Sequence, residues 1–359
     1  MLKTFKYRLY PSQEEKEKIE QTLNDCRFLY NSALEQRIVA YRKHGVSLTY
    51  NKQQNELPQL KKEMPEYNKI HSQVLQNVLK RLDFSFQNFF RRVKNGEKPG
   101  FPRFQGRNRY DSFTYPQSGF SIEGDRLRLS KIGEVRIHLH RKMEGKVKTC
   151  TIIRKNGKYY VCFACEIEQV VHVTGKQVGV DVGIAHLAIT SDGDFFDNPK
   201  HLRKSERQLK RLQRIVSRRK KGSNRRRKAV LLLARKHERI ANQRKDTNHK
   251  VSRKLVDQYD LIVFEDLNIK GMVKNRRLSK AIHEVSWNQL IAFATYKAEY
   301  ADKTVKVVNP RNTSQMCSNC GLIVPKKLSE RLHRCPCGYT AHRDINAARN
   351  ILKLGLEAG

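Results

Sequence analysis

The stretch KQVGVDVGIAHLAITSDGDFF, residues 176–196, decides the fold of this chain. Valine occupies every second position from Val178 to Val182, glycine and Asp181 occupy the positions between, and an apolar run with a Ser-Asp-Gly turn follows. This pattern predicts two β-strands joined by a tight turn. Because successive side chains of a strand point to opposite faces, Asp181 shares its face with glycine, where a metal ion or a polymer backbone can come close. A surface aspartate at a strand end would give the same local pattern. The choice between a functional residue and an ordinary surface aspartate therefore depends on residues far downstream.

The charge of the chain indicates a polyanionic partner. Its 359 residues include 73 lysines and arginines against 35 acidic residues, a net charge of +38. A charge of this size repels itself unless a polyanion is bound. It is spread along the whole chain rather than set opposite an apolar stripe, which favours nucleic acid over a membrane surface as the partner. The sequence has no apolar run long enough for a membrane span and no signal-like N-terminus, so we expect a cytoplasmic protein.

The first half of the chain combines long helices with short strands. Residues 2–10 alternate as a strand, and Ser12 with Glu15 makes a capping box that begins an amphipathic helix. A second long helix is predicted over residues 71–94, and short alternating segments separated by glycine-containing turns occupy residues 112–166. Regular short strands indicate a small β-barrel, which the first strand could complete. The helices would then be an insertion into the barrel.

Two short motifs in these predicted strands are not interpreted as metal sites. Cys162 and Cys165 lie in one strand, where their odd offset sends the two sulfur atoms to opposite faces. His138 and His140 have the spacing of a metal-binding pair, but no helix with a nucleophilic tyrosine accompanies them as a tyrosine-type strand-transfer enzyme would require. We interpret the two histidines as alternating surface residues of a basic strand.

A basic helical hairpin is predicted after the Asp181 segment. Residues 201–250 contain 20 lysines and arginines and only 3 acidic residues. Their apolar residues recur at helical spacing, and Gly222-Ser223-Asn224 marks a turn between two helices. A few basic residues would be explained by a helix face exposed to solvent. Twenty lysines and arginines in this segment favour contact with a phosphate backbone instead. Further along, another helix is predicted over residues 283–300.

Four cysteines near the C-terminus have the spacing of a structural zinc site. Cys317-x-x-Cys320 and Cys335-x-Cys337 are each followed by glycine and lie 14 residues apart, which predicts a four-thiolate zinc ribbon. The second pair is one residue tighter than the usual spacing. His333 and His342 are alternative ligands, which we do not favour because four cysteines complete the site. A disulfide is disfavoured in a reducing compartment.

Three carboxylates form a second candidate site. Asp181 and Glu265 each end an apolar strand, the latter within DLIVFEDL at residues 260–267, and Asp344 begins the helix RDINAARNILKL. Carboxylates on apolar elements are costly unless a cation is bound. Mg²⁺ prefers oxygen ligands, and two-metal phosphodiester cleavage needs a few carboxylates that converge from different elements. The sequence does not decide whether Asp266 replaces Glu265 or supports it.

Four ordered motifs resemble one family. GVDVGIAHLAI, IVFEDLN, TSQMCSNCG and HRDINAARNIL are similar to the RuvC-type nuclease core and zinc ribbon of the TnpB (OrfB) proteins of insertion sequences, which are related to the miniature type V CRISPR nucleases. FKYRLYPSQEE, KPGFPRF and NRYDSFTY resemble the front half of that family. The resemblance therefore covers essentially the whole chain.

The resemblance implies a multidomain α+β protein. It implies an N-terminal β-barrel (wedge) domain, residues 1–10 and 101–170, interrupted by a helical recognition domain, residues 11–100. A RuvC-like (RNase H-like) mixed α/β nuclease domain would follow over residues 171–309 and 341–359, with the zinc ribbon embedded at 310–340.

The family carries an acidic triad, which the motifs place at Asp181, Glu265 and Asp344 as catalytic residues and as ligands of two Mg²⁺ ions.

The implied activity is RNA-guided cleavage of double-stranded DNA next to a short flanking motif, with a transposon-derived guide RNA as partner and a monomer favoured. In the cell, such a protein would associate with the nucleoid when bound to DNA. The expected nucleic-acid contacts are nine arginines, namely Arg91, Arg92, Arg103, Arg107, Arg218, Arg219, Arg225, Arg226 and Arg227. The alternative is a catalytically silent RNA-guided DNA-binding repressor, against which the three intact acidic residues argue.

Overall fold

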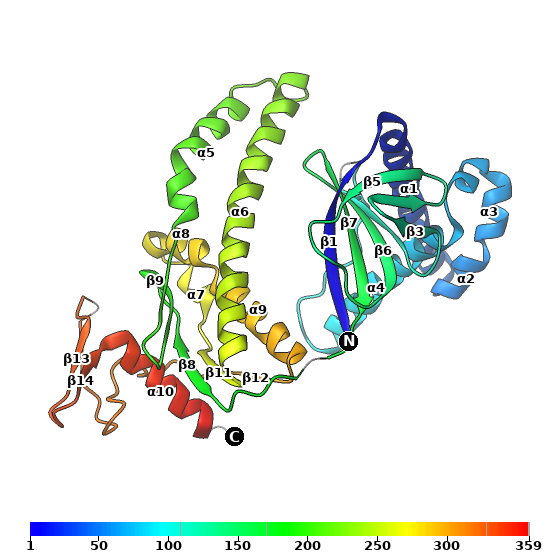
Figure 1. Cartoon of the computed structure of the whole chain (residues 1–359). Helices are drawn as coiled ribbons and strands as arrows, with labels where there is room; N and C mark the ends of the chain where they lie inside the picture. Colours follow the sequence, from blue (N-terminus) through cyan, green and yellow to red (C-terminus); the bar gives the residue numbers. More distant parts are fainter. Residues whose placement is uncertain (108, 170, 328, 358–359) are drawn as a thin grey trace. The chain divides into compact units, whose positions relative to one another are not determined.

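The structure is a computed structural model that describes residues 1–107, 109–169, 171–327 and 329–357. The chain divides into two compact units, Met1–Glu168 and Gln169–Gly359 (Figure 1). Asn108, which belongs to the NRYDSFTY motif, lies outside the described residues. None of the described helices is both long enough and apolar enough to cross a membrane.

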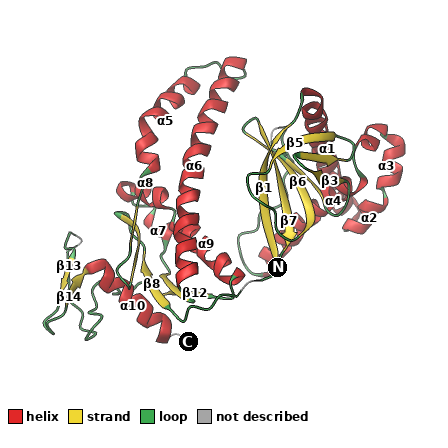
Figure 2. Ribbon diagram, viewed as in Figure 1, coloured by secondary structure: helices red, strands yellow, loops and turns green. Residues whose placement is uncertain are grey.

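A seven-stranded antiparallel sheet forms the β part of the first unit (Figure 2). Its strands are β1 (Leu2–Tyr10), β2 (Ser112–Tyr115), β3 (Phe120–Glu123), β4 (Arg126–Leu129), β5 (Gly133–His138), β6 (Lys146–Lys155) and β7 (Lys158–Glu166). They are ordered β2-β6-β7-β1-β5-β4-β3, so the first strand of the chain belongs to this sheet, as predicted, and lies in its middle. Among the described residues no pairing joins β2 to β3, and the sheet is therefore not seen to close into a barrel.

The side chains of β7 alternate between the two faces of the sheet, and its two cysteines lie on opposite faces. Side chains of this strand are alternately buried and partly exposed, with Cys165 buried and Cys162 on the other face. The two thiols therefore point to opposite sides of the sheet and do not form a metal site with each other.

The helices of the first unit all lie between β1 and β2 in the chain. They are α1 (Gln13–His44), α2 (Tyr50–Asn55), α3 (Leu57–Glu63), a 3-10 helix (Pro65–Lys69) and α4 (Ser72–Lys94). The predicted capping box begins α1, because the Ser12 hydroxyl accepts the Glu15 N–H and the Glu15 carboxylate accepts the Ser12 N–H. The apolar faces of α1 and α4 pack with the sheet into one core.

The second unit is built on a five-stranded mixed sheet. Its strands are β8 (Gln177–Asp181), β9 (His186–Thr190), β10 (Phe195–Asp197), β11 (Leu261–Glu265) and β12 (Thr304–Val308). The order is β10-β9-β8-β11-β12, with β8, β11 and β12 parallel and β9 and β10 antiparallel to their neighbours. The predicted hairpin of residues 176–196 is thus β8 and β9.

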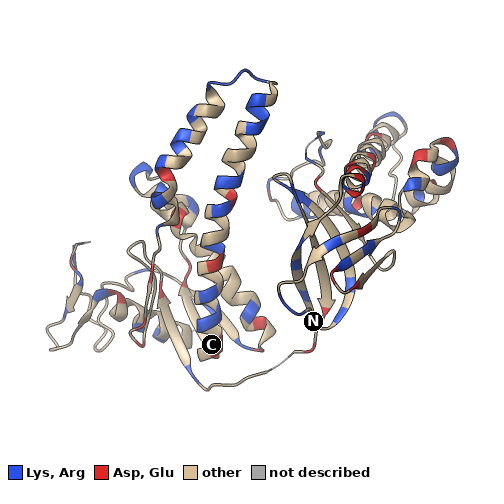
Figure 3. Ribbon diagram, turned by 45° about the horizontal axis from the view of Figure 1, so that its top comes forward, with Lys and Arg blue, Asp and Glu red and all other residues tan. Residues whose placement is uncertain are grey.

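The predicted basic hairpin is present in the second unit. It consists of α5 (His201–Ser217) and α6 (Asn224–Gln258), which run side by side (Figure 1) and carry many of the lysines and arginines of this unit (Figure 3). The Ser223 hydroxyl caps α6 by accepting the Arg226 N–H.

The remaining helices are α7 (Ile269–Met272), α8 (Arg276–Val285), α9 (Trp287–Tyr300) and α10 (Arg343–Glu357). The helix predicted from about residue 283 to 300 is α9, which begins at Trp287 rather than near residue 283, because Ser286 adopts a φ of +55° and separates α8 from α9.

Helices cover both faces of this sheet. Val178, Val180 and Phe264 pack with α6 and α9 in the larger core, whereas Val263 packs with Ile351 of α10 on the other face. The small ribbon strands β13 (Leu332–Arg334) and β14 (Thr340–His342) directly precede α10. The start of α10 is therefore tied both to the sheet and to the cysteine region.

Candidate active site and zinc centre

The parallel pairing of β8 with β11 places two of the three predicted carboxylates next to each other. Val180 pairs with Phe264, so Asp181 and Glu265 are the next residues along the two strands, at the same edge of the sheet. Gly179, two positions before Asp181, faces α10. Because a strand returns to the same face every second residue, Asp181 also lies on the face that α10 covers.

The third carboxylate, Asp344, lies in the first turn of α10. Burial, together with the negative charges of Glu265 and Asp344, raises the pKa of Asp181 to about 8, against a smaller opposing effect of Arg343. Glu265 and Asp344 therefore lie close enough to Asp181 for their charges to act on its carboxylate. The structure therefore brings together the residues that the sequence predicted, from two strands and one helix.

Glu265 is the least exposed of the three acidic residues, and its side chain has a buried hydrogen-bond partner. It is 7% exposed, and it accepts a hydrogen bond from the Thr313 hydroxyl. Burial raises the pKa of Glu265, and this hydrogen bond opposes the rise. Asp344 is also largely shielded, with one carboxylate oxygen 3.6 Å from an Arg331 guanidinium nitrogen. Asp266, by contrast, is exposed, and its N–H donates to the Val308 carbonyl.

The donor set of this acidic site suits a hard divalent cation. Its side chains offer only carboxylate oxygens, which are the ligands that Mg²⁺ prefers. A cation bound at these carboxylates would favour their charged forms, because it offsets the repulsion between them. Within the described part of the chain, only the four cysteines bring three or more potential ligand atoms within 4.8 Å of one another. The carboxylate oxygens of Asp181, Glu265 and Asp344 therefore lie farther from one another than the four sulfur atoms do.

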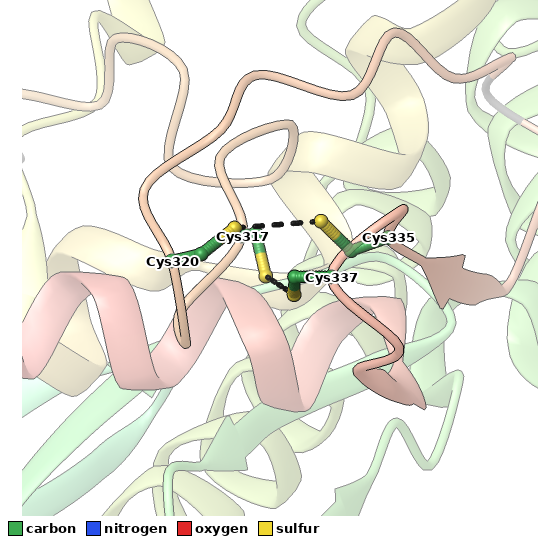
Figure 4. Close-up of side chains that lie close together, drawn as sticks. All are labelled: Cys317, Cys320, Cys335 and Cys337. Carbon is green, nitrogen blue, oxygen red and sulfur yellow. Dashed lines mark hydrogen bonds between the residues drawn. The ribbon is translucent and has the colours of Figure 1, made fainter.

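The four predicted cysteines converge as a metal centre (Figure 4). The sulfur atoms of Cys317 and Cys337 are 3.8 Å apart, and those of Cys320 and Cys335 are 3.5 Å apart. Tetrahedral zinc with a Zn–S distance of about 2.3 Å requires sulfur atoms about 3.8 Å apart, whereas a disulfide requires about 2 Å. The tighter spacing of the second pair therefore does not prevent a tetrahedral site.

The two histidines near this centre are not part of it. His333 is fully buried, and its Nδ1 contacts the Lys326 ammonium group. His342 accepts the Asp344 N–H through its Nδ1 at 3.3 Å. Neither joins the group of convergent thiols among the described residues.

The predicted nucleic-acid-binding arginines lie at helix ends and in connecting segments. Arg91 and Arg92 are exposed in the last turn of α4, and Arg103 and Arg107 are exposed in the segment after it. The others surround the turn between α5 and α6; these are Arg218, Arg219, Arg225, Arg226 and Arg227, of which Arg226 is partly buried and the rest exposed.

Three polar residues that link the acidic site to the cysteine region were not predicted from the sequence. Thr313 contacts Glu265, and the buried amides of Asn346 and Asn350 on α10 bond to the backbone around Cys317. Two asparagines four residues apart on the apolar side of a helix are a sequence signal of a buried polar contact. Their partners could not be identified without the fold.

Family models match three parts of the chain. The OrfB_IS605 family, described as "Probable transposase", matches residues 160–276, and the Cas12f1-like TNB domain matches residues 287–351. A helix-turn-helix domain of OrfB_IS605 proteins matches residues 1–45, which in this structure form β1 and the single helix α1.

Full-length relatives are also found. The "Putative RNA-guided DNA endonuclease" of Streptomyces pristinaespiralis is 34% identical over 366 residues, which cover 99% of this chain and 90% of the relative. InsQ of Escherichia coli K12, which carries the same description, is 34% identical and covers 99% of this chain and 92% of the relative. Cas12f1 of Sulfoacidibacillus thermotolerans, a CRISPR-associated endodeoxyribonuclease, is 29% identical over 55% of this chain and 50% of its own length.

The fold has counterparts among solved structures. The Cas12f1 chain in a complex with guide RNA and target DNA has a TM-score of 0.62 and 12% identity, with 98% of each chain covered. CasPhi-2 bound to crRNA has a TM-score of 0.50 and 11% identity, with 99% of this chain and 98% of the other covered. At these identities the likeness is one of fold.

Proposed function

Because this chain belongs to the TnpB (OrfB) family of transposon-encoded proteins related to the miniature type V CRISPR nucleases, we propose that it is an RNA-guided, metal-dependent DNA endonuclease. Two relatives that match over nearly their whole length carry the name RNA-guided DNA endonuclease. The observation that supports the activity most strongly is the convergence of Asp181, Glu265 and Asp344 at one edge of the mixed sheet.

The three carboxylates would hold two Mg²⁺ ions. Bound there, the ions would supply an activated water and neutralise charge on the phosphodiester. The protein groups provide the rest: Asp181 and Glu265 are fixed by adjacent parallel strands, and Asp344 is fixed by the first turn of α10. Glu265 also accepts a hydrogen bond from the Thr313 hydroxyl. Burial of these groups removes water that would otherwise screen them.

The partners are a guide RNA and double-stranded DNA. Base pairing between the guide and one DNA strand would give sequence specificity, while the protein holds the heteroduplex by its backbone and reads a short flanking motif. Arg225, Arg226 and Arg227 support this role, because they lie in the first turn of α6, where the helix dipole disfavours cations and no acidic residue compensates. A bound phosphate backbone would offset that repulsion.

The domains follow from the order of the elements. The sheet of the first unit would be the wedge domain, residues 1–10 and 101–170, and the helices between β1 and β2 would be the recognition domain, residues 11–100. In the second unit, residues 171–309 and 341–359 would be the RuvC-like nuclease domain. The ribbon, residues 310–340, lies between β12 and α10, and its four thiolates would bind one structural zinc ion with no coordination position left for a substrate.

A catalytically silent repressor would need the same fold without a working metal site. The three largely shielded carboxylates argue against that alternative, since the charges of two of them act on Asp181 and a protein with no use for them would be more stable without them. The test of the guided function is to copurify nucleic acid with the protein and to sequence it. One recurrent RNA adjoining the gene of the protein is expected, and a mixture of unrelated RNAs would contradict guidance.

A further inference from the structure

One hydrogen bond connects the acidic site to the segment that leads into the zinc ribbon. The hydroxyl of Thr313 donates to Oε1 of Glu265 and also lies 3.2 Å from the Pro310 carbonyl. Both residues of the pair are buried, Thr313 at 3% exposure and Glu265 at 7%. A charged acceptor makes the stronger hydrogen bond, so the carboxylate takes the proton of this hydroxyl.

Two buried asparagines hold Thr313 in place. Asn350 of α10 donates to the carbonyls of Thr313, at 2.8 Å, and Met316, at 2.7 Å. Asn346, one turn earlier on the same face, also donates to the Met316 carbonyl at 2.7 Å and accepts the Ser318 N–H at 2.9 Å. Both amides are fully buried. The backbone from Thr313 to Ser318 is therefore bound directly to the helix that begins with Asp344.

The first zinc ligand lies within this bound segment. Cys317 stands between Met316 and Ser318, whose backbone groups contact the asparagines. The position of the Cys317 sulfur and the position of the Thr313 hydroxyl are consequently set by the same four bonds to α10. A change at the zinc centre would be transmitted to Glu265 over only four residues of chain.

We propose that Thr313 is a positioning residue that orients Glu265 for divalent-cation binding, and that the zinc ribbon couples to the acidic site through it. The proposal rests on the proposed function, which assigns Glu265 to the magnesium site. The hydroxyl donates to Oε1 of Glu265 and so restricts the rotation of this carboxylate. Outer partners of metal-binding residues act in this way by fixing the orientation of the ligand, and their loss costs about 10- to 100-fold in metal affinity.

The test measures binding of Mn²⁺, as a substitute for Mg²⁺, to the full zinc-loaded chain freed of nucleic acid, by the electron paramagnetic resonance signal of free Mn²⁺. Thr313→Val keeps the shape of the side chain and removes the hydroxyl, and we expect an affinity about 10-fold weaker. Thr313→Ser keeps the hydroxyl and should bind Mn²⁺ like the wild type. The matched control is Thr295→Val, because the Thr295 hydroxyl donates to the Ile291 carbonyl of its own helix.

The coupling to zinc is tested with Cys320→Ser, which removes an exposed thiolate from the ribbon. This change should weaken Mn²⁺ binding in the wild-type background and should add little to Thr313→Val, because both act through the same hydroxyl. The zinc content of each variant is measured by mass spectrometry. Thr313→Val should keep its zinc.

The outcomes separate this inference from the function on which it rests. Wild-type affinity in Thr313→Val, equal losses in the valine and serine variants, or fully additive effects of Thr313→Val and Cys320→Ser would each overturn the inference. Asp181→Ala serves as the reference for the acidic site itself. If Mn²⁺ binding is unchanged in Asp181→Ala, the magnesium site fails, whatever the result for Thr313.

Discussion

Gly179 of β8 lies so close to Ala348 of α10 that a Cβ atom added to the glycine would be 1.9 Å from the Ala348 carbonyl oxygen. The same imaginary atom would be 2.6 Å from the backbone nitrogen of Leu352. The obstacle is helix backbone, which cannot move aside as a flexible side chain can. This contact sets the distance between α10 and the sheet, and it therefore sets where Asp344 lies relative to Asp181.

The first prediction concerns this contact. Gly179→Ala should push α10 away from β8 and lower the free energy of unfolding by about 3 kcal/mol, as overpacking of a close contact does. Thermal unfolding measures the loss. The control is Gly100→Ala, where the nearest atom to the added Cβ is an Arg92 side-chain nitrogen at 3.9 Å. Equal unfolding temperatures for the Gly179 variant and the wild type would refute this account of α10.

The second prediction is a pH dependence of stability without metal. The pKa of an aspartate in an unfolded chain is about 3.9, whereas burial and two neighbouring carboxylates raise the pKa of folded Asp181 to about 8. Between these values the folded state binds more protons than the unfolded state, so stability falls as the pH rises from about 4 to about 8. Asp181→Asn should remove part of this fall and should be the more stable protein near pH 8.

Denaturant unfolding at several pH values, with and without Mg²⁺, checks this prediction. Mg²⁺ should stabilise the wild type near pH 8 and should have less effect on Asp181→Asn, because the cation offsets the repulsion that the substitution removes. Asp266→Asn is the matched control, since Asp266 neighbours the site but is exposed. Two results together would contradict the raised pKa of Asp181. The stability of the wild type would rise over this pH range, and Asp181→Asn would be no more stable than the wild type near pH 8.

The third prediction concerns the zinc centre. Cys317→Ser should lose zinc and destabilise the second unit by about 3 kcal/mol, which corresponds to about 10 °C in unfolding temperature for a unit of this size. Hydrogen exchange should increase in α10 and in the ribbon strands β13 and β14. Cys162→Ser, in the sheet of the first unit, should keep the zinc. Full zinc occupancy in the Cys317 variant would exclude the four-thiolate site.

The fourth prediction concerns the start of α6. Replacing Arg225, Arg226 and Arg227 together by glutamine should weaken RNA binding and reduce the slope of log affinity against log salt by about 2 to 3. The control replaces three cations that already pair with a carboxylate on their own helix, namely Lys18, Lys250 and Arg253. A salt slope of the arginine variant equal to that of the wild type would show that the start of α6 does not contact the phosphate backbone.

The sequence predicted the parts of the site that follow from local periodicity. Alternation and an apolar run located the strands that end at Asp181 and Glu265, and the spacing of four cysteines located the ribbon. The choice between Glu265 and Asp266 stayed open, because either residue can end a strand. The structure separates them through the register of β8 with β11, a pairing of segments about 80 residues apart that no local pattern specifies.

Contacts that depend on tertiary packing were not predictable. Thr313 lies in an irregular segment, and its hydroxyl has a specific role only because α10 holds that segment against β11. The break at Ser286 was missed for a related reason, since a serine at positive φ leaves no signal in the apolar spacing of the two helices. Closure of the first sheet likewise depends on strand pairings that are not set by the alternation within each strand.

The most direct test of the central claim is cleavage of target DNA by the purified complex of protein and guide RNA in the presence of Mg²⁺, compared between the wild type and Asp181→Ala. The account predicts that the variant binds the guide RNA with unchanged affinity and cuts at least about 1000-fold more slowly, because removal of a shared metal ligand removes the metal chemistry. Cutting at the wild-type rate by Asp181→Ala would contradict the assignment of Asp181, Glu265 and Asp344 as the active site.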